Sequence, residues 1–91
     1  MLWYRAAGPY TMLRRTDVKG QDINCNYKDY NGRVQSYCQL NGDLANQISA
    51  CNDNPKCKAI TIQSDYSGYL KAGKPASPPL YREGFVTYVK N

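Results

Sequence analysis

The sequence has no histidine, and its single glutamate is Glu83. Histidine and the acidic side chains supply most general acids and bases in enzymes, and the aspartates here stand in turn-like stretches, where such side chains usually bond to the backbone. The chain also lacks the Gly-x-Ser-x-Gly motif of a serine nucleophile. We therefore expect a protein that is not an enzyme.

Metal and redox motifs are missing too. Structural zinc needs four cysteine or histidine ligands, usually as two closely spaced pairs, whereas no two cysteines of this chain are closer than six positions. The Cys-x-x-Cys motif of redox enzymes is absent. We expect no metal site and no cofactor.

Long apolar runs and clustered charges are also absent. No stretch approaches the roughly 20 apolar residues that cross a bilayer, and no basic amphipathic helix is present, so we expect no membrane insertion. The 12 lysines and arginines outnumber the 7 acidic residues but are scattered. This pattern argues against a nucleic-acid partner, and a cationic antimicrobial role has only the net charge in its favour.

Four cysteines are present, and an even number in a small chain is typical of disulfides formed in an oxidising compartment. The Asn-Gly pair at 31–32 predicts a hairpin turn. Antiparallel arms would then place Cys25 opposite Cys38, within disulfide reach. Cys51 and Cys57 flank an Asn-Asp-Asn-Pro turn, and their pairing would join a helix to a strand.

Local patterns predict a small antiparallel sheet, stapled by disulfides and packed against one short helix, which is the α+β class. We expect residues 10–91 to form this domain and residues 1–9 to form an N-terminal arm, whose apolar run is too short for a secretory leader. The predicted elements are a strand over Tyr10–Val18, a helix from Leu44 to about Asn52 capped by Asp43, a strand over Lys56–Ser64, its hairpin partner over Gly68–Ala72, a loop over 73–79 and a last strand over Phe85–Lys90.

Side-chain alternation leaves one question open. If Cys57 faces the helix, the strand period places Ile60 and Ile62 on the opposite face. Either both faces of this strand are covered, or a bulge changes the alternation after Cys57.

Residues 10–90 resemble the PAN/apple domains in the order of a helix followed by CNDNPKCKAITI, GYLKAG and EGFVTYVK, with TDVKGQDI upstream. The resemblance implies a bond between Cys51 and Cys57. It also implies that Gln47 and Gly68 occupy the positions of a second cysteine pair, both members of which are absent here. The bond between Cys25 and Cys38 would then be an additional disulfide, outside the pattern common to these domains.

PAN/apple domains bind proteins or carbohydrates, so the resemblance implies a secreted, extracellular, non-catalytic module for recognition or adhesion. Tyrosine rings that stack on sugars and lysines that pair with acidic groups agree with this role. Each candidate also has the alternative of being an ordinary surface or core residue. The candidate ligand contacts are Tyr66, Tyr69, Lys71, Lys56 and Lys58.

A different hypothesis is a structural subunit of a self-associating extracellular assembly, such as a filament or surface layer. Its basis is the apolar arm with Leu2, Trp3 and Tyr4, because exposed aromatic side chains are favoured at interfaces. The alternative is a frayed terminus.

Overall fold

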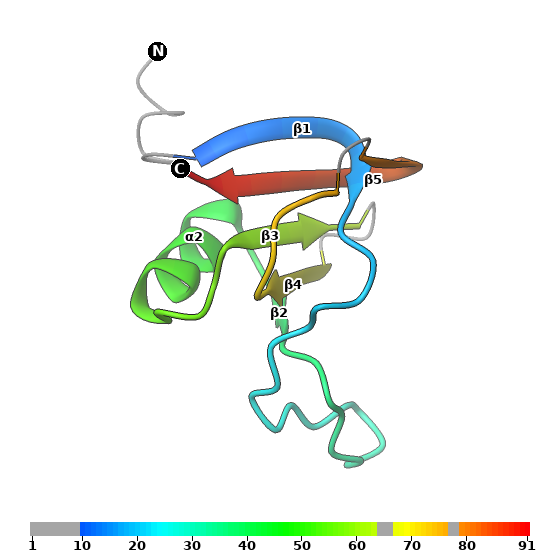
Figure 1. The fold of residues 1–91 in the computed structure, drawn as a ribbon. Helices are drawn as coiled ribbons and strands as arrows, with labels where there is room; N and C mark the ends of the chain where they lie inside the picture. Colours follow the sequence, from blue (N-terminus) through cyan, green and yellow to red (C-terminus); the bar gives the residue numbers. More distant parts are fainter. Residues whose placement is uncertain (1–9, 64–66, 77–78) are drawn as a thin grey trace.

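The computed structural model describes residues 10–63, 67–76 and 79–91. It contains a five-stranded antiparallel sheet with the spatial order β1-β5-β3-β4-β2, and one helix lies along one face of that sheet (Figure 1). The predicted α+β class is confirmed. The elements are β1 (Tyr10–Asp17), β2 (Gln39–Asn41), α2 (Leu44–Asp53), β3 (Ala59–Ile62), β4 (Ser67–Lys71) and β5 (Leu80–Lys90).

Helix α2 begins and ends near the residues that the sequence predicts. The Asp43 carboxylate accepts the backbone N–H of Asn46 at 3.0 Å, which satisfies one of the free donors of the first turn. At the other end, the N–H of Asn54 donates to the carbonyl of Cys51, and Pro55 disfavours a helical conformation at the residue before it. No helix of the described residues is long and apolar enough to cross a membrane.

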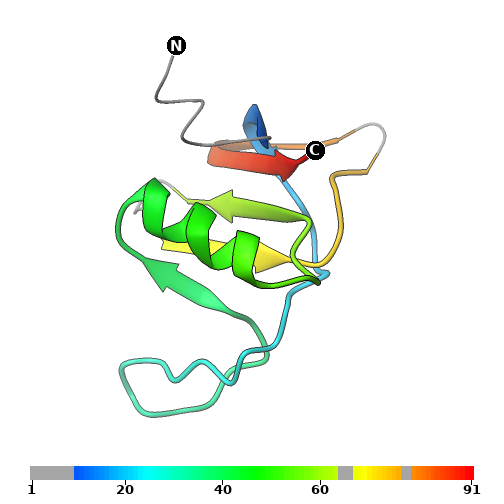
Figure 2. The ribbon, with the colours of Figure 1, turned by 90° about the vertical axis from the view of Figure 1, so that its left-hand side faces the viewer.

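Figure 2 shows α2 lying along the sheet, and the hydrophobic core contains residues of both. Ile60 of β3 is fully buried in this core, and Cys57 belongs to the same cluster. On the other face of β3, Ala59 and Thr61 are also buried. Both faces of the strand are therefore covered, and strict alternation does not extend back to Cys57, which precedes the first residue of β3.

Both predicted disulfides are present. The Cα atoms are 5.1 Å apart in Cys25–Cys38 and 5.3 Å apart in Cys51–Cys57, and the described part of the chain has no free cysteine. The second bond is almost completely buried, with Cys51 0% and Cys57 1% exposed. It fixes the end of α2 to the chain that enters the central strand.

We call residues 25–38 the stapled loop; Figure 2 shows it extending away from the helix and sheet. Its arms are not regular strands, since only Lys28 and Val34 form a β-bridge. Asp29 and Arg33 close a three-residue turn in which Gly32 has a φ of +80°, a known alternative to a two-residue Asn-Gly turn. The predicted register is therefore wrong by one residue, although the disulfide partners still meet.

We call residues 17–22 the crossing segment. It leads from β1 across the sheet face opposite α2 to the end of β4, on the side of that strand where β2 pairs (Figure 1). There the N–H of Ile23 donates to Leu70 and the N–H of Ala72 donates to Gln21, at 3.1 and 2.8 Å. Val18, within the segment, is only 2% exposed. The crossing segment thus covers part of the sheet face opposite α2.

Candidate functional site

The pairing of β1 with β5 contains a wide bulge. Arg14 pairs with Val86, but Thr16 pairs with Tyr81, so four residues of β5 lie opposite Arg15 alone. The backbone turns sharply here, with φ values of +53° at residue 15 and +82° at residue 84, which is a glycine. Bulges of this kind bend a strand and redirect its side chains.

The bulge brings two side chains of β5 together. In a regular strand, residues three apart point to opposite faces. Here the guanidinium of Arg82 lies 4.4 Å from the ring centre of Phe85, within the range of a cation–π contact. Arg82 also donates from Nη1 to Oδ2 of Asp17 at 3.0 Å. The bulge therefore turns a cation and an aromatic ring toward the start of the crossing segment.

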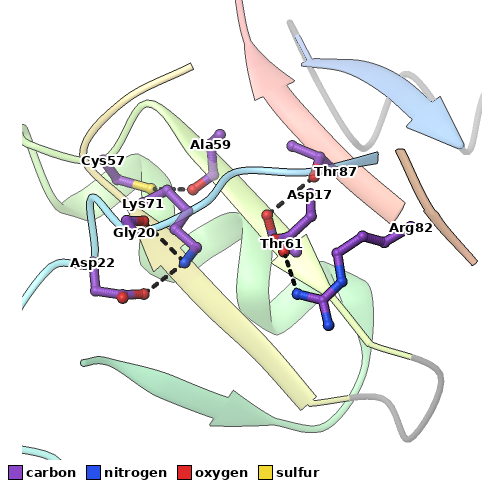
Figure 3. Close-up of polar contacts among 9 residues, drawn as sticks. All are labelled: Asp17, Gly20, Asp22, Cys57, Ala59, Thr61, Lys71, Arg82 and Thr87. Carbon is purple, nitrogen blue, oxygen red and sulfur yellow. Dashed lines mark hydrogen bonds and ion pairs between the residues drawn. The ribbon is translucent and has the colours of Figure 1, made fainter. Parts of the chain in front are cut away.

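A second ion pair lies where the crossing segment reaches β4 (Figure 3). The Nζ of Lys71 donates to Oδ1 of Asp22 at 2.6 Å and to the carbonyl oxygen of Gly20 at 3.1 Å. The Lys71 side chain is only 8% exposed. A buried ammonium is stable only when it is paired and hydrogen-bonded, and these two acceptors meet that need.

Between the two ion pairs, threonine hydroxyls join the strands. The hydroxyls of Thr61 and Thr87 are 3.0 Å apart (Figure 3). Thr87 also donates to the carbonyl of Thr16 at 2.7 Å. All three threonines are at most 2% exposed. These hydrogen bonds hold the end of β1 against the central strands, beside the groove described next.

A groove of about 360 Å³ opens on this face of the sheet. Its volume lies at the lower end of the range for small-molecule sites, about 300–1,000 Å³. Aromatic side chains from three separate segments line it together with both ion pairs. The lining residues are Asp17, Val18, Lys19, Gly20, Asp22, Tyr37, Thr61, Gln63, Tyr69, Lys71, Arg82 and Phe85.

The predicted ligand contacts are distributed over several places. Tyr69 and Lys71 both line the groove. Lys56 lies instead beside a different hollow, together with Pro55, and Lys58 is exposed outside the groove. Tyr66 and the predicted arm residues Leu2, Trp3 and Tyr4 fall outside the described residues.

Sequence reasoning did not identify the other charged and aromatic residues of the groove. The sequence places Asp17 near the end of the first predicted strand and Asp22 in a turn-like stretch, and Arg82 precedes the predicted start of the last strand. A glycine inside a strand pattern often marks a bulge, so Gly84 is the residue that could have indicated the bulge of β5. Tyr37 could not be placed because its position depends on the path of the stapled loop.

The described residues contain no group of three or more potential metal-ligating side chains. Both groove carboxylates are instead hydrogen-bonded to a lysine or an arginine. The site thus offers aromatic faces, two cation–carboxylate pairs and a threonine hydroxyl network, an arrangement suited to holding a polar ligand.

Comparisons with known proteins do not place this chain in a family. No model of a known protein family matches it, and neither a curated protein nor a solved structure is significantly similar.

Proposed function

We propose that this protein is a non-catalytic extracellular recognition module that binds carbohydrate in the groove opposite α2. The observation that carries the proposal is the presence of Tyr37, Tyr69 and Phe85 together with two cation–carboxylate pairs in one groove. Binding sites combine aromatic surface with a few convergent polar groups. Sugar rings present C–H faces for the aromatic rings and hydroxyls for the polar groups.

The ion pairs favour a neutral sugar over an acidic one. Each pair places a cationic donor beside an anionic acceptor, and a hydroxyl both donates and accepts hydrogen bonds. The charges of Lys71 and Arg82 are already balanced by Asp22 and Asp17. Lys56, a candidate contact for acidic groups, lies outside the groove.

The disulfides support an extracellular location. Bonds such as Cys25–Cys38 and Cys51–Cys57 form and persist in oxidising compartments and are rare in the cytosol. An extracellular position would also expose the groove to glycans on cells or secreted proteins.

Membership of the PAN/apple domains is part of this proposal. Two contacts support it. Cys51 is bonded to Cys57, and a Cβ atom on Gly68 would overlap the side-chain amide of Gln47. These are the positions at which the resemblance expects one cysteine pair to be kept and the other to be replaced.

The test is a titration of isotope-labelled protein, followed by NMR, with neutral oligosaccharides of glucose, galactose or N-acetylglucosamine and with heparin fragments. We expect a neutral sugar to shift the amide signals of Thr61, Tyr69 and Phe85. Phe85→Ala should weaken that binding by about two- to tenfold, the amount that a lost aromatic contact removes.

Tyr81→Ala is the matched control, because Tyr81 is an aromatic residue of the same strand, 70% exposed and outside the groove. It should leave the affinity unchanged. The proposal fails if none of these sugars shifts the groove signals, or if heparin alone binds and shifts only Lys56 and Lys58.

A further inference from the structure

Three tyrosines form a continuous series from the groove onto the stapled loop. The ring centres of Tyr69 and Tyr37 are 5.6 Å apart, and those of Tyr37 and Tyr27 are 5.8 Å apart. We call these residues the tyrosine ladder. Tyr69 and Tyr37 line the groove, whereas Tyr27 lies beyond it on the stapled loop.

The ladder is not part of the hydrophobic core. Among the described residues, the core cluster and the side chains packed on it include Tyr10 and Tyr88 but none of the ladder tyrosines. All three ladder residues are intermediate in exposure, so parts of their side chains face solvent. Aromatic surface placed beside a groove in this way is available to a ligand.

The loop that carries Tyr27 is held in place by its own bonds. The Cys25–Cys38 disulfide closes its base. Nearer the tip, the Asp29 carboxylate accepts the backbone N–H of Arg33 at 3.0 Å and that of Asn31 at 2.9 Å. It also accepts a hydrogen bond from the side-chain amide of Gln35 at 2.8 Å. The backbone N–H of Gln35 in turn donates to the carbonyl of Tyr27. A surface organised before binding loses less conformational entropy when a ligand arrives.

We propose that the binding site continues along the tyrosine ladder, so that its ligand is a linear oligosaccharide of at least two neutral sugar units. One unit occupies the groove beside Tyr69 and Phe85, and the next lies along Tyr37 and Tyr27. This inference rests on the proposed function, since it concerns the same site and specifies the length of its ligand.

The test compares mono-, di-, tri- and tetrasaccharides of one neutral sugar that binds the wild-type protein, by calorimetry and by NMR. Affinity should rise with chain length. Tyr27→Ala should weaken binding of the longer sugars by about two- to tenfold, as expected for one aromatic contact, and leave binding of the monosaccharide unchanged. Tyr27→Phe should bind like the wild type, because the ring face rather than the hydroxyl makes the contact.

Tyr30→Ala is the matched control, since Tyr30 lies in the same loop, is 96% exposed and is not part of the ladder. The wild-type spectra test the inference independently of any folding defect in the variants: longer sugars should shift the amide signal of Tyr27, which lies outside the groove, and the monosaccharide should not. Binding that is independent of length, or equally weakened at all lengths by Tyr27→Ala, overturns this inference and leaves the proposed function standing. No binding at any length overturns both.

Discussion

Gln47 and Gly68 show how one residue sets the space available to another. The Gln47 side chain donates from Nε2 to the carbonyls of Gly42 and Leu40, and it lies where a side chain on Gly68 would have to be. Gly68 does not have a positive φ, so its backbone conformation does not call for glycine. Glycine is needed here because of the packing of Gln47.

We expect Gly68→Ala to lower the free energy of unfolding by about 1–3 kcal/mol, the usual cost of overpacking. Gln47→Ala should also destabilise, because it removes the two hydrogen bonds to Gly42 and Leu40. In the double variant the alanine at 68 has room, so the combined loss should be smaller than the sum. Urea unfolding of the three variants tests this, and additive losses would contradict the packing argument.

Asp29 makes the stapled loop sensitive to acid. The backbone N–H of Arg33, followed by the side-chain amide of Gln35, lowers the pKa of the Asp29 carboxyl. A carboxyl whose pKa is lower in the folded state stabilises that state at pH values above its unfolded pKa of about 3.9. This contribution disappears as the pH falls through the lowered folded pKa.

We therefore expect the loop amides of Asn31 and Arg33 to exchange slowly with solvent at pH 6 and to lose this protection at pH 2, relative to the intrinsic exchange rates. In Asp29→Asn the same amides should be less protected at pH 6 and should show little further loss on acidification. Amide exchange followed by NMR measures both effects. Equal protection in the wild type and the variant at pH 6 would mean that the carboxylate does not order the loop.

At the scale of elements, the sequence predicts well those segments whose structure depends on neighbours in the chain. Helix α2 has its cap at Asp43 and ends just before Pro55, and β3 and β4 have local β-strand patterns. The three-residue β2 and the first half of β5 were missed. Each becomes a strand through pairing with distant residues, as Thr16 pairs with Tyr81.

The bulge of β5 links strand geometry to the groove. Gly84 has a φ of +82°, a conformation that costs a residue with a Cβ atom about 1–2 kcal/mol. We expect Gly84→Ala to destabilise the protein by about this amount and to weaken sugar binding, because Arg82 and Phe85 would lose their shared orientation. Urea unfolding and calorimetric titration measure the two effects.

Gly42→Ala is the control for this change. Gly42 also has a positive φ, +124°, but it lies in the turn before α2 and does not line the groove. This variant should lose stability while it keeps its sugar affinity. A Gly84→Ala protein that binds sugar like the wild type would show that the bulge does not orient the binding residues.

At the scale of the whole molecule, the two disulfides account for a large part of the expected stability. The chain-entropy model assigns about 2 kcal/mol to a closed loop of the length between Cys51 and Cys57 and about 3 kcal/mol to the longer one. Domains of this kind are stable by only about 5–15 kcal/mol. Loss of both bonds would therefore remove a large part of the free energy of unfolding.

We expect reduction of both bonds to lower the urea midpoint strongly and to leave part of the population unfolded in buffer. Circular dichroism measures the unfolding, and mass spectrometry after thiol alkylation verifies the reduction. Alanine at Cys51 and Cys57 removes the smaller entropy term but also leaves a cavity in the buried core. This variant should therefore lose the signal of α2 at lower urea than one with alanine at Cys25 and Cys38. An unchanged midpoint in fully reduced protein would contradict a stabilising role of the bonds.

The groove was less predictable than the fold because it is assembled from distant segments. Tyr69 and Lys71 were identified from a local pattern of aromatic and basic residues. Asp17 and Arg82, 65 positions apart, meet only because β1 pairs with β5 and a bulge redirects one of them. No local pattern in a single sequence contains that information.

The pairing of Tyr10 with Lys90 determines how the protein could be displayed on a larger object. These residues lie together at one end of the β1–β5 ribbon, and the pair Thr16–Tyr81 beside the groove is about 20 Å away along β1, at roughly 3.3 Å per residue. The groove opens on the sheet face rather than at this end, and neither Tyr10 nor Lys90 lines it, so a tether attached next to either residue would leave the groove open to approaching glycans. Copies immobilised on a bead or sensor through this end should remain as accessible as the protein in solution.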